Sequence, residues 1–274
     1  MVIGILKEPS FETRVSLLPE HLSFVKKMKA NVCVEEKAGA GVLVPDESYH
    51  EQGAEVCSRE EVIRRSDIIL AIQPPAAEEI SRLQGKVLLG MYQPLANPRR
   101  IIEWSAVPDL TVFSMEMLPR TTRAQVMDVL SSQANIAGYK AVLMAANLYP
   151  RYFPMFMTAA GSIPPARVLI LGAGVAGLQA IATAKRLGAV VEVFDTRPAV
   201  KEEVMSLGAK FIEVAGAADS SGAGGYAVEQ SAEFLQRQQA RIAESAAKSD
   251  IIITTAQIPG KKAPVLITQV MIQS

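Results

Sequence analysis

Short apolar runs alternate with amphipathic stretches along the first part of the chain. Five of these runs predict strands: Val2–Leu6, Val32–Glu35, Ile68–Ile72, Val87–Met91 and Leu110–Phe113. The stretches between them fit helices, one opened by Pro19 and another by a capping box of Ser58 and Glu61. Alternation of this kind predicts a mostly parallel sheet with helices on both faces.

A longer amphipathic segment follows, from Arg123 to about Leu148, with apolar residues at helical spacing and no proline. We expect one helix that leaves a first domain, residues 1–130, and enters a second domain, residues 131–274. A second alternating series then predicts four more strands: Arg167–Leu171, Val190–Phe194, Lys210–Val214 and Asp250–Thr254. The predicted fold class is α/β, with two Rossmann-like, doubly wound parallel-sheet domains joined by a long helix. Such a dinucleotide domain usually has more strands than these four, so we expect the second to be incomplete at its C-terminus.

Composition narrows the function classes. The 274 residues contain 28 Lys and Arg against 28 Asp and Glu, so the total charge gives no indication of nucleic acid or of an anionic membrane as a partner. No apolar run approaches the length of about 20 residues that a membrane helix needs. The first residues lack the features of a signal peptide. We therefore expect a cytoplasmic chain that does not itself insert into a membrane.

The cysteines and histidines give no support for a metal site or a disulfide. Cys33 and Cys57 lie in apolar runs of a chain without secretory features, so buried structural thiols are expected rather than a disulfide. His21 and His50 have no second His or Cys at ligand spacing. We expect no bound metal.

The strongest chemical signal is a set of three glycines, Gly172, Gly174 and Gly177, between a predicted strand and a helical run. The first glycine permits a tight turn, the second allows the backbone to approach a pyrophosphate, and the third lets the helix pack closely on the strand. The start of the helix supplies unpaired N–H donors for the phosphates. The alternative is a glycine-rich turn that serves packing alone.

An acidic residue follows the next strand, as a dinucleotide site requires. Asp195 lies 18 residues after Gly177, where its carboxylate can accept hydrogen bonds from the adenosine ribose and repel the 2′-phosphate of NADP. Arg197 weakens this distinction, because an arginine there can bind a 2′-phosphate. On balance the residues favour NAD(H) over NADP(H).

A second polar cluster spans the predicted junction between the domains. Its members are Arg120, Arg123, Gln125, Asp128, Ser131 and Ser132. The spacing of three would place Gln125, Asp128 and Ser131 on one helix face, with donors and acceptors suited to a carboxamide. The alternative is a solvated first helical turn with an Arg–Asp pair.

Residues 215–234 separate the third and fourth strands of the second series and are rich in Ala, Gly and Ser. This composition predicts a mobile loop. A passive surface insertion is the alternative.

The chain resembles a known family through three segments: MLPRTTRAQVMDVLSSQANIAGYKAV, MTAAGSIPPARVLILGAGVAGLQAIATAKRLGA and TTAQIPGKKAPVLIT. They are similar to the NAD(H)-binding alpha component of proton-translocating nicotinamide nucleotide transhydrogenases. The wider family includes alanine dehydrogenase, which is similar in the opening segment KEPSFETRV.

The resemblance implies roles for individual residues. Arg120, Gln125, Asp128 and Ser131 would hold the nicotinamide for hydride transfer, with Arg123 close by. Other positions that the resemblance places near the cofactor are Val175, Asp195, Thr196, Arg197, Gly225, Tyr226, Gln238, Ala256 and Gln257. The family usually has Leu where this chain has Gln257.

The resemblance also implies an activity and partners. The activity is hydride transfer between NADH on this chain and NADP⁺ on a partner subunit, coupled to proton translocation by a separate membrane component. A homodimer, located peripherally at the cytoplasmic face of the membrane, is implied as well.

Two other functions remain open. Alanine dehydrogenase uses a Lys and a His for proton transfer, whereas the matching strand ends here carry Gln73 and Tyr92-Gln93, and of that substrate site only Arg14 is retained. A catalytically silent NAD-binding module would share the glycines and Asp195, although it would not need residues that orient the nicotinamide.

Overall fold

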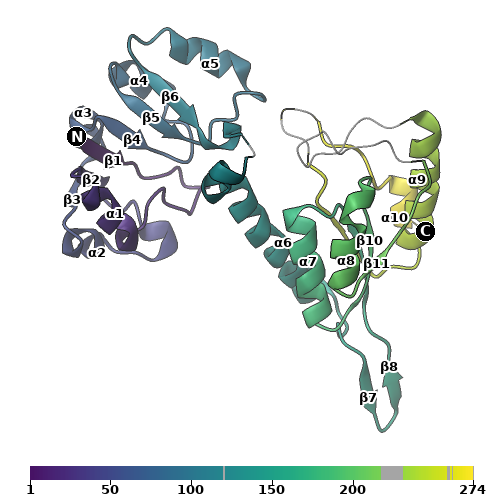
Figure 1. Ribbon diagram of the computed structural model, residues 1–274. Helices are drawn as coiled ribbons and strands as arrows, with labels where there is room; N and C mark the ends of the chain where they lie inside the picture. Colours follow the sequence, from purple (N-terminus) through teal and green to yellow (C-terminus); the bar gives the residue numbers. More distant parts are fainter. Residues whose placement is uncertain (120, 217–230, 258–259, 261, 274) are drawn as a thin grey trace. The chain divides into compact units, whose positions relative to one another are not determined.

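The computed structural model describes residues 1–119, 121–216, 231–257, 260 and 262–273. Internal contacts divide the chain into two compact units, Met1–Asp128 and Val129–Ser274. Each unit is built around its own parallel sheet (Figure 1). The α/β fold class with parallel sheets is therefore confirmed.

The first unit contains a six-stranded sheet in the order β3-β2-β1-β4-β5-β6, with every neighbouring pair parallel. Its strands are β1 (Val2–Ile5), β2 (Asn31–Glu35), β3 (Glu55–Cys57), β4 (Ile68–Leu70), β5 (Val87–Gly90) and β6 (Thr111–Ser114). Five of them match the predicted strands. β3 was not predicted, because this short edge strand has no clear alternation of apolar and polar residues. The strand order reverses between β1 and β4, and such a reversal opens a crevice at the carboxyl ends of the two strands.

Helices cover the two faces of this sheet. They are α1 (Leu22–Lys27), α2 (Asp46–Glu51), α3 (Arg59–Arg65), α4 (Ala77–Ile80) and α5 (Pro98–Ser105), with short 3₁₀ turns η1 (Pro19–His21), η2 (Ala40–Val42), η3 (Ser81–Leu83), η4 (Met115–Met117) and η5 (Thr122–Met127). Leu22 and Tyr49 pack on one face, whereas Val62 and Trp104 pack on the other. A doubly wound core results, since each face buries a separate apolar cluster.

The predicted start of α3 is correct in part. Ser58 caps the helix by accepting a hydrogen bond from the backbone N–H of Glu61. The carboxylate of Glu61 does not complete a capping box, because it forms an ion pair with Arg64 one turn further along.

The second unit contains a four-stranded parallel sheet in the order β11-β10-β9-β12. The strands are β9 (Arg167–Leu171), β10 (Val190–Phe194), β11 (Lys210–Phe211) and β12 (Ile251–Thr254). Its helices are α6 (Val129–Leu148), α7 (Val175–Arg186), α8 (Lys201–Ser206), α9 (Ala232–Ala246) and α10 (Gln269–Gln273), with a 3₁₀ turn η6 (Pro198–Val200). All four strands follow the prediction, which placed β9 at the centre of a nucleotide-binding sheet.

The predicted helix from Arg123 to Leu148 is not continuous. Thr121 caps a separate 3₁₀ turn, η5, and Asp128 ends it with a non-helical ψ of 84°. Asp favours such breaks because its short polar side chain competes with the helix for backbone hydrogen bonds. α6 therefore begins only at Val129 and belongs to the second unit.

A two-stranded antiparallel hairpin, β7 (Phe156–Thr158) and β8 (Gly161–Ile163), was also not predicted. It projects from the second unit (Figure 1). Most of its residues are exposed, so it has no buried face that could produce an alternating pattern.

α6 packs against α7 through a glycine. A Cβ atom at Gly138 would lie 2.0 Å from the carbonyl oxygen of Ala176, so the two backbones are in direct contact. Asn135 reinforces the contact by donating a hydrogen bond from Nδ2 to Oε1 of Gln179 at 3.1 Å. The position of α6 on the first turn of α7 therefore depends on the missing side chain at Gly138.

The remaining structural expectations have mixed outcomes. Both cysteines are free thiols; Cys33 is buried as predicted, while Cys57 is half-buried. Of the loop predicted over residues 215–234, residues 217–230 lie outside the described residues, and Ala232–Phe234 already belong to α9 because Ser231 caps that helix. No helix in the described part of the chain is both long and apolar enough to cross a membrane.

Candidate functional site

The glycine loop joins the central strand of the second unit to α7. β9 ends at Leu171, and α7 begins at Val175 with Gly174 as its N-cap. Gly172 has a φ of +106°, which side-chain-bearing residues rarely adopt. A Cβ atom at Gly177 would lie 1.9 Å from the carbonyl oxygen of Gly172. The first and third glycines are thus required by the turn and by the packing of the helix on it.

The start of α7 has the chemistry of an anion site. No side chain caps it, because Gly174 occupies the N-cap position. The first N–H groups of a helix have no partner within the helix, and its dipole places partial positive charge there. A phosphate group fits such a helix start without any charged side chain.

Asp195 lies directly after β10, beside the glycine loop. Its Oδ2 accepts a hydrogen bond of 2.7 Å from the backbone N–H of Ala173, and its Oδ1 accepts one of 2.8 Å from the backbone N–H of Arg197. The guanidinium of Arg197 binds both oxygens, from Nε at 2.9 Å and from Nη2 at 2.8 Å. Burial raises the pKa of Asp195, but the hydrogen bonds from Arg197 and Ala173 outweigh it, and the net pKa is below the usual value.

Other residues of the predicted cofactor site lie around this loop. Val175 is the first residue of α7, and Thr196 lies between Asp195 and Arg197. Ala256 and Gln257 follow β12, the strand next to β9, and a Cβ atom at Gly172 would lie 3.3 Å from the backbone nitrogen of Ala256.

Gln238 is the most buried polar residue among the predicted site positions, with 4% of its surface exposed. It lies on α9 between Phe234 and Ile242, which pack into the core. Its Oε1 has no hydrogen-bond partner within the described residues. Such an oxygen is costly in a folded protein unless a donor satisfies it.

The polar segment at the junction is only partly brought together. Arg123 and Gln125 are exposed on η5, and Asp128 ends the first unit, whereas Ser131 lies in the first turn of α6 in the second unit. The prediction that Gln125, Asp128 and Ser131 share one helix face is wrong, because the chain leaves the helical conformation at Asp128. Arg120, Gly225 and Tyr226 lie outside the described residues.

Sequence reasoning missed Thr255. Its hydroxyl donates a hydrogen bond of 3.0 Å to the carbonyl oxygen of Gly172. The position was detectable in principle, because Thr255 follows the strand predicted at Asp250–Thr254, and the ends of parallel strands meet at one edge of a sheet.

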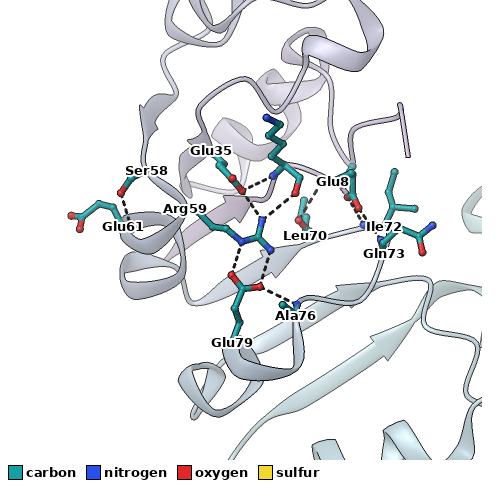
Figure 2. Close-up of polar contacts among 12 residues, drawn as sticks. Glu8, Glu35, Ser58, Arg59, Glu61, Leu70, Ile72, Gln73, Ala76 and Glu79 are labelled. Atoms are coloured by element: carbon teal, nitrogen blue, oxygen red, sulfur yellow. Dashed lines mark hydrogen bonds and ion pairs between the residues drawn. The ribbon is translucent and has the colours of Figure 1, made fainter. Parts of the chain in front are cut away.

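The first unit has its own pocket, of about 390 Å³, where β1 and β4 end (Figure 2). Arg59, at the start of α3, lies in its wall and binds two carboxylates. Nε and Nη2 bind Glu79 at 2.5 and 2.9 Å, and Nη1 binds Glu35 at 2.8 Å. The guanidinium thereby joins α3, α4 and the end of β2.

Glu35 repeats in this unit the position that Asp195 has in the other. Each acid stands at the end of the second strand and accepts a 2.7 Å hydrogen bond from a backbone N–H two residues past the central strand, that of Lys7 or of Ala173. The loop after β1 carries Lys7, Glu8 and Pro9 in place of glycines. It therefore lacks the open backbone that a pyrophosphate site needs.

A second set of polar contacts lies at the rim of this pocket. Glu8 accepts hydrogen bonds from the backbone N–H groups of Ile72 and Gln73, at 2.6 and 2.9 Å (Figure 2). Glu12 binds the guanidinium of Arg14 through both oxygens and accepts a hydrogen bond from Nε2 of Gln73. The side-chain hydrogen bond from Arg14 lowers the pKa of Glu12 to about 2.

Comparison with known proteins decides the family. Residues 4–137 match the N-terminal domain model of alanine dehydrogenase/PNT, and residues 141–274 match its C-terminal domain model. The chain belongs to the alanine dehydrogenase/PNT family.

Within the alanine dehydrogenase/PNT family the chain is more similar to transhydrogenases. The NAD(P) transhydrogenase alpha subunit of Rhodospirillum rubrum, in the first of its pieces, is 45% identical, over 99% of this chain and 73% of that protein. The crystal structure of the transhydrogenase from Sinorhizobium meliloti matches with a TM-score of 0.86 and 45% identity, over 99% of this chain and 74% of that one. Alanine dehydrogenase of Staphylococcus saprophyticus is 26% identical, over 100% of this chain and 69% of that protein.

Proposed function

We propose that this chain is the NAD(H)-binding component of a proton-translocating transhydrogenase. The observation that carries the proposal is the glycine loop Gly172–Gly177, which opens α7 at the carboxyl end of β9, beside the buried carboxylate of Asp195. The transhydrogenase relatives at 45% identity support the same function.

The residues of the second unit fit a dinucleotide. The first N–H groups of α7 would bind the pyrophosphate, and Asp195 would accept hydrogen bonds from the adenosine ribose. Resemblance supports Arg120, Arg123, Gln125, Asp128 and Ser131 as the residues that orient the nicotinamide. It supports Val175, Thr196, Arg197, Gly225, Tyr226, Gln238, Ala256 and Gln257 as further contacts.

The bound cofactor supplies the hydride, which passes to NADP⁺ on a partner subunit. Because no proton moves at the reacting carbons, this chain needs groups that position the nicotinamide and exclude water, but no general acid or base. Gln73 and Gln93, which replace the Lys and His expected of alanine dehydrogenase, agree with that requirement. The guanidinium of Arg14 is engaged by Glu12 and is not free to bind a substrate carboxylate.

Resemblance further supports an assembly. The chain would act with an NADP(H)-binding component and a membrane component that translocates protons, as a homodimer held at the cytoplasmic face of the membrane. The names of its relatives as alpha subunits agree with such partners.

One pair of assays tests the proposal. NADH oxidation by the chain is followed with the NADP⁺-loaded partner subunit and, separately, with pyruvate and ammonium. Oxidation that requires the partner is the expected result. Oxidation with pyruvate and ammonium would instead establish an amino-acid dehydrogenase, and NADH binding without oxidation in either assay would establish a silent nucleotide-binding module.

A further inference from the structure

One peptide unit of the glycine loop is held from both sides. The peptide that joins Gly172 to Ala173 points its N–H and its carbonyl oxygen in opposite directions, because a trans peptide is planar. The N–H of Ala173 donates to Oδ2 of Asp195 at 2.7 Å, and the carbonyl oxygen of Gly172 accepts from the hydroxyl of Thr255 at 3.0 Å.

The sheet order explains this arrangement. β9 leads into the loop and lies between β10, which ends before Asp195, and β12, which ends before Thr255. The backbone N–H of Thr255 continues the pairing of β12 with β9 by donating to the carbonyl oxygen of Leu171 at 2.8 Å. The threonine side chain is therefore fixed next to the loop by its own backbone.

The space around the hydroxyl is narrow. A Cβ atom at Gly172 would lie 2.7 Å from Oγ1 of Thr255, and one at Gly177 would lie 3.2 Å from it. The hydroxyl thus lies against both the first and the third glycine, where the loop meets α7. A rotation of the Gly172 peptide would break its hydrogen bond to Thr255 and the bond of Ala173 to Asp195 together.

We infer that Thr255 is a positioning residue for the nucleotide, acting through the Gly172–Ala173 peptide. The inference rests on the proposed function, since it assumes that a dinucleotide binds at this loop. By fixing the peptide, Thr255 keeps the N–H groups at the start of α7 open to the pyrophosphate. It also keeps Asp195 hydrogen-bonded to the loop, so the phosphate and ribose contacts are aligned before the ligand binds.

The test compares Thr255→Val with two matched variants of the full chain. Valine keeps the shape of threonine and removes the hydroxyl, whereas Thr255→Ser keeps the hydroxyl. Thr254→Val makes the same change at the adjacent exposed position. We expect the Kd for NADH to rise about 2- to 12-fold in Thr255→Val, the effect of one lost hydrogen bond, and to stay within about 2-fold in the other two.

A double-mutant cycle separates positioning from general stability. Because Thr255 and Asp195 hold the same peptide, the losses in NADH affinity of Thr255→Val and Asp195→Asn should not multiply when combined. Faster amide hydrogen exchange at Ala173 in ligand-free Thr255→Val is expected as well. Thr255→Cys, with a weak donor of similar size, replaces the valine variant if that one does not fold.

The outcomes distinguish the inference from the proposed function. Wild-type chain that binds NADH, with Thr255→Val binding it equally well, overturns the inference alone. Losses that multiply independently in the double variant also overturn it. Wild-type chain that does not bind NADH overturns both the inference and the proposed function.

Discussion

The carboxylate of Asp195 holds the guanidinium of Arg197 through two parallel hydrogen bonds, of 2.9 and 2.8 Å. With the backbone N–H groups of Ala173 and Arg197, it accepts four hydrogen bonds, which is about the full capacity of a carboxylate. A ribose hydroxyl that binds Asp195 must therefore displace or share one of these donors. The Arg197 side chain is the one that can leave, because the other two donors belong to the backbone.

Removal of this carboxylate should weaken nucleotide binding. We expect Asp195→Ala to reduce the affinity for NADH by about 1–3 kcal/mol, because the ribose loses its acceptor and the Ala173 N–H loses its partner. Titration of NADH fluorescence measures the change. Glu213→Gln, an exposed carboxylate in the same unit, is the control and should bind as the wild type does. An unchanged dissociation constant for Asp195→Ala would show that this residue does not contact the ribose.

Gln125 should affect chemistry more than affinity. As a residue proposed to orient the nicotinamide, its loss in Gln125→Ala should slow hydride transfer to the NADP⁺-loaded partner more than it raises the Kd for NADH. Single-turnover rates and binding titrations on the same preparation give both quantities. Equal losses in rate and affinity would contradict the positioning role.

The close approach of α6 to α7 should tolerate no side chain. Gly138→Ala places a Cβ atom against the carbonyl oxygen of Ala176, a backbone atom that cannot rotate away. We expect the free energy of unfolding of the second unit to fall by about 1–3 kcal/mol, as overpacked cores do. Urea denaturation measures it, with Ala137→Ser at an exposed position of the same helix as the control. Wild-type stability in Gly138→Ala would mean that the helices can separate without cost.

Two arginines of α3 should differ sharply in their effect on stability. Arg59→Gln leaves Glu35 and Glu79, only 13% and 14% exposed, without their cation, and should lower the free energy of unfolding by about 2 kcal/mol. Arg64→Gln removes an ion pair at the surface and should leave the stability unchanged. Urea denaturation of both variants provides the comparison, and similar losses in the two would refute it.

Glu12 should contribute to the acid sensitivity of the first unit. Its pKa falls from an ordinary 4.5 to about 2 in the folded chain, mainly through the hydrogen bond from Arg14. A carboxyl with a lowered folded pKa stabilises the fold above pH 4.5, and this contribution is lost as the pH falls towards 2. We expect the difference in unfolding free energy between the wild type and Glu12→Gln to shrink over that interval. A constant difference would show that the Arg14 contact does not depend on the charge of Glu12.

The glycine loop and Asp195 could be predicted because they follow strands with unambiguous apolar patterns. The strand Arg167–Leu171 fixes where the loop begins, and the helical run after Gly177 fixes where it ends. β3 and the hairpin β7–β8 could not be predicted, because short edge or exposed strands have no alternating buried face. The break at Asp128 was missed since periodicity continues across it and only the backbone conformation changes.

Interactions between distant segments were beyond the sequence. Arg59 meets Glu35 and Glu79, which lie 24 and 20 residues away, only because α3 and α4 start at the same edge of the sheet. In the same way, 83 residues separate Thr255 from Gly172. Such pairs depend on strand order and register, which a single sequence does not specify.

The two acidic residues that end a second strand differ in how readily they can give up their cation. The partner of Asp195 is two residues away in the chain, so the pair can part by rotation of one arginine side chain, which is among the fast motions of a protein. The partner of Glu35 also binds Glu79, and its release requires α3 and α4 to move apart. The second unit can therefore exchange its internal cation for a ligand at the rate of side-chain motion, while the first unit can do so only at the slower rate of local unfolding.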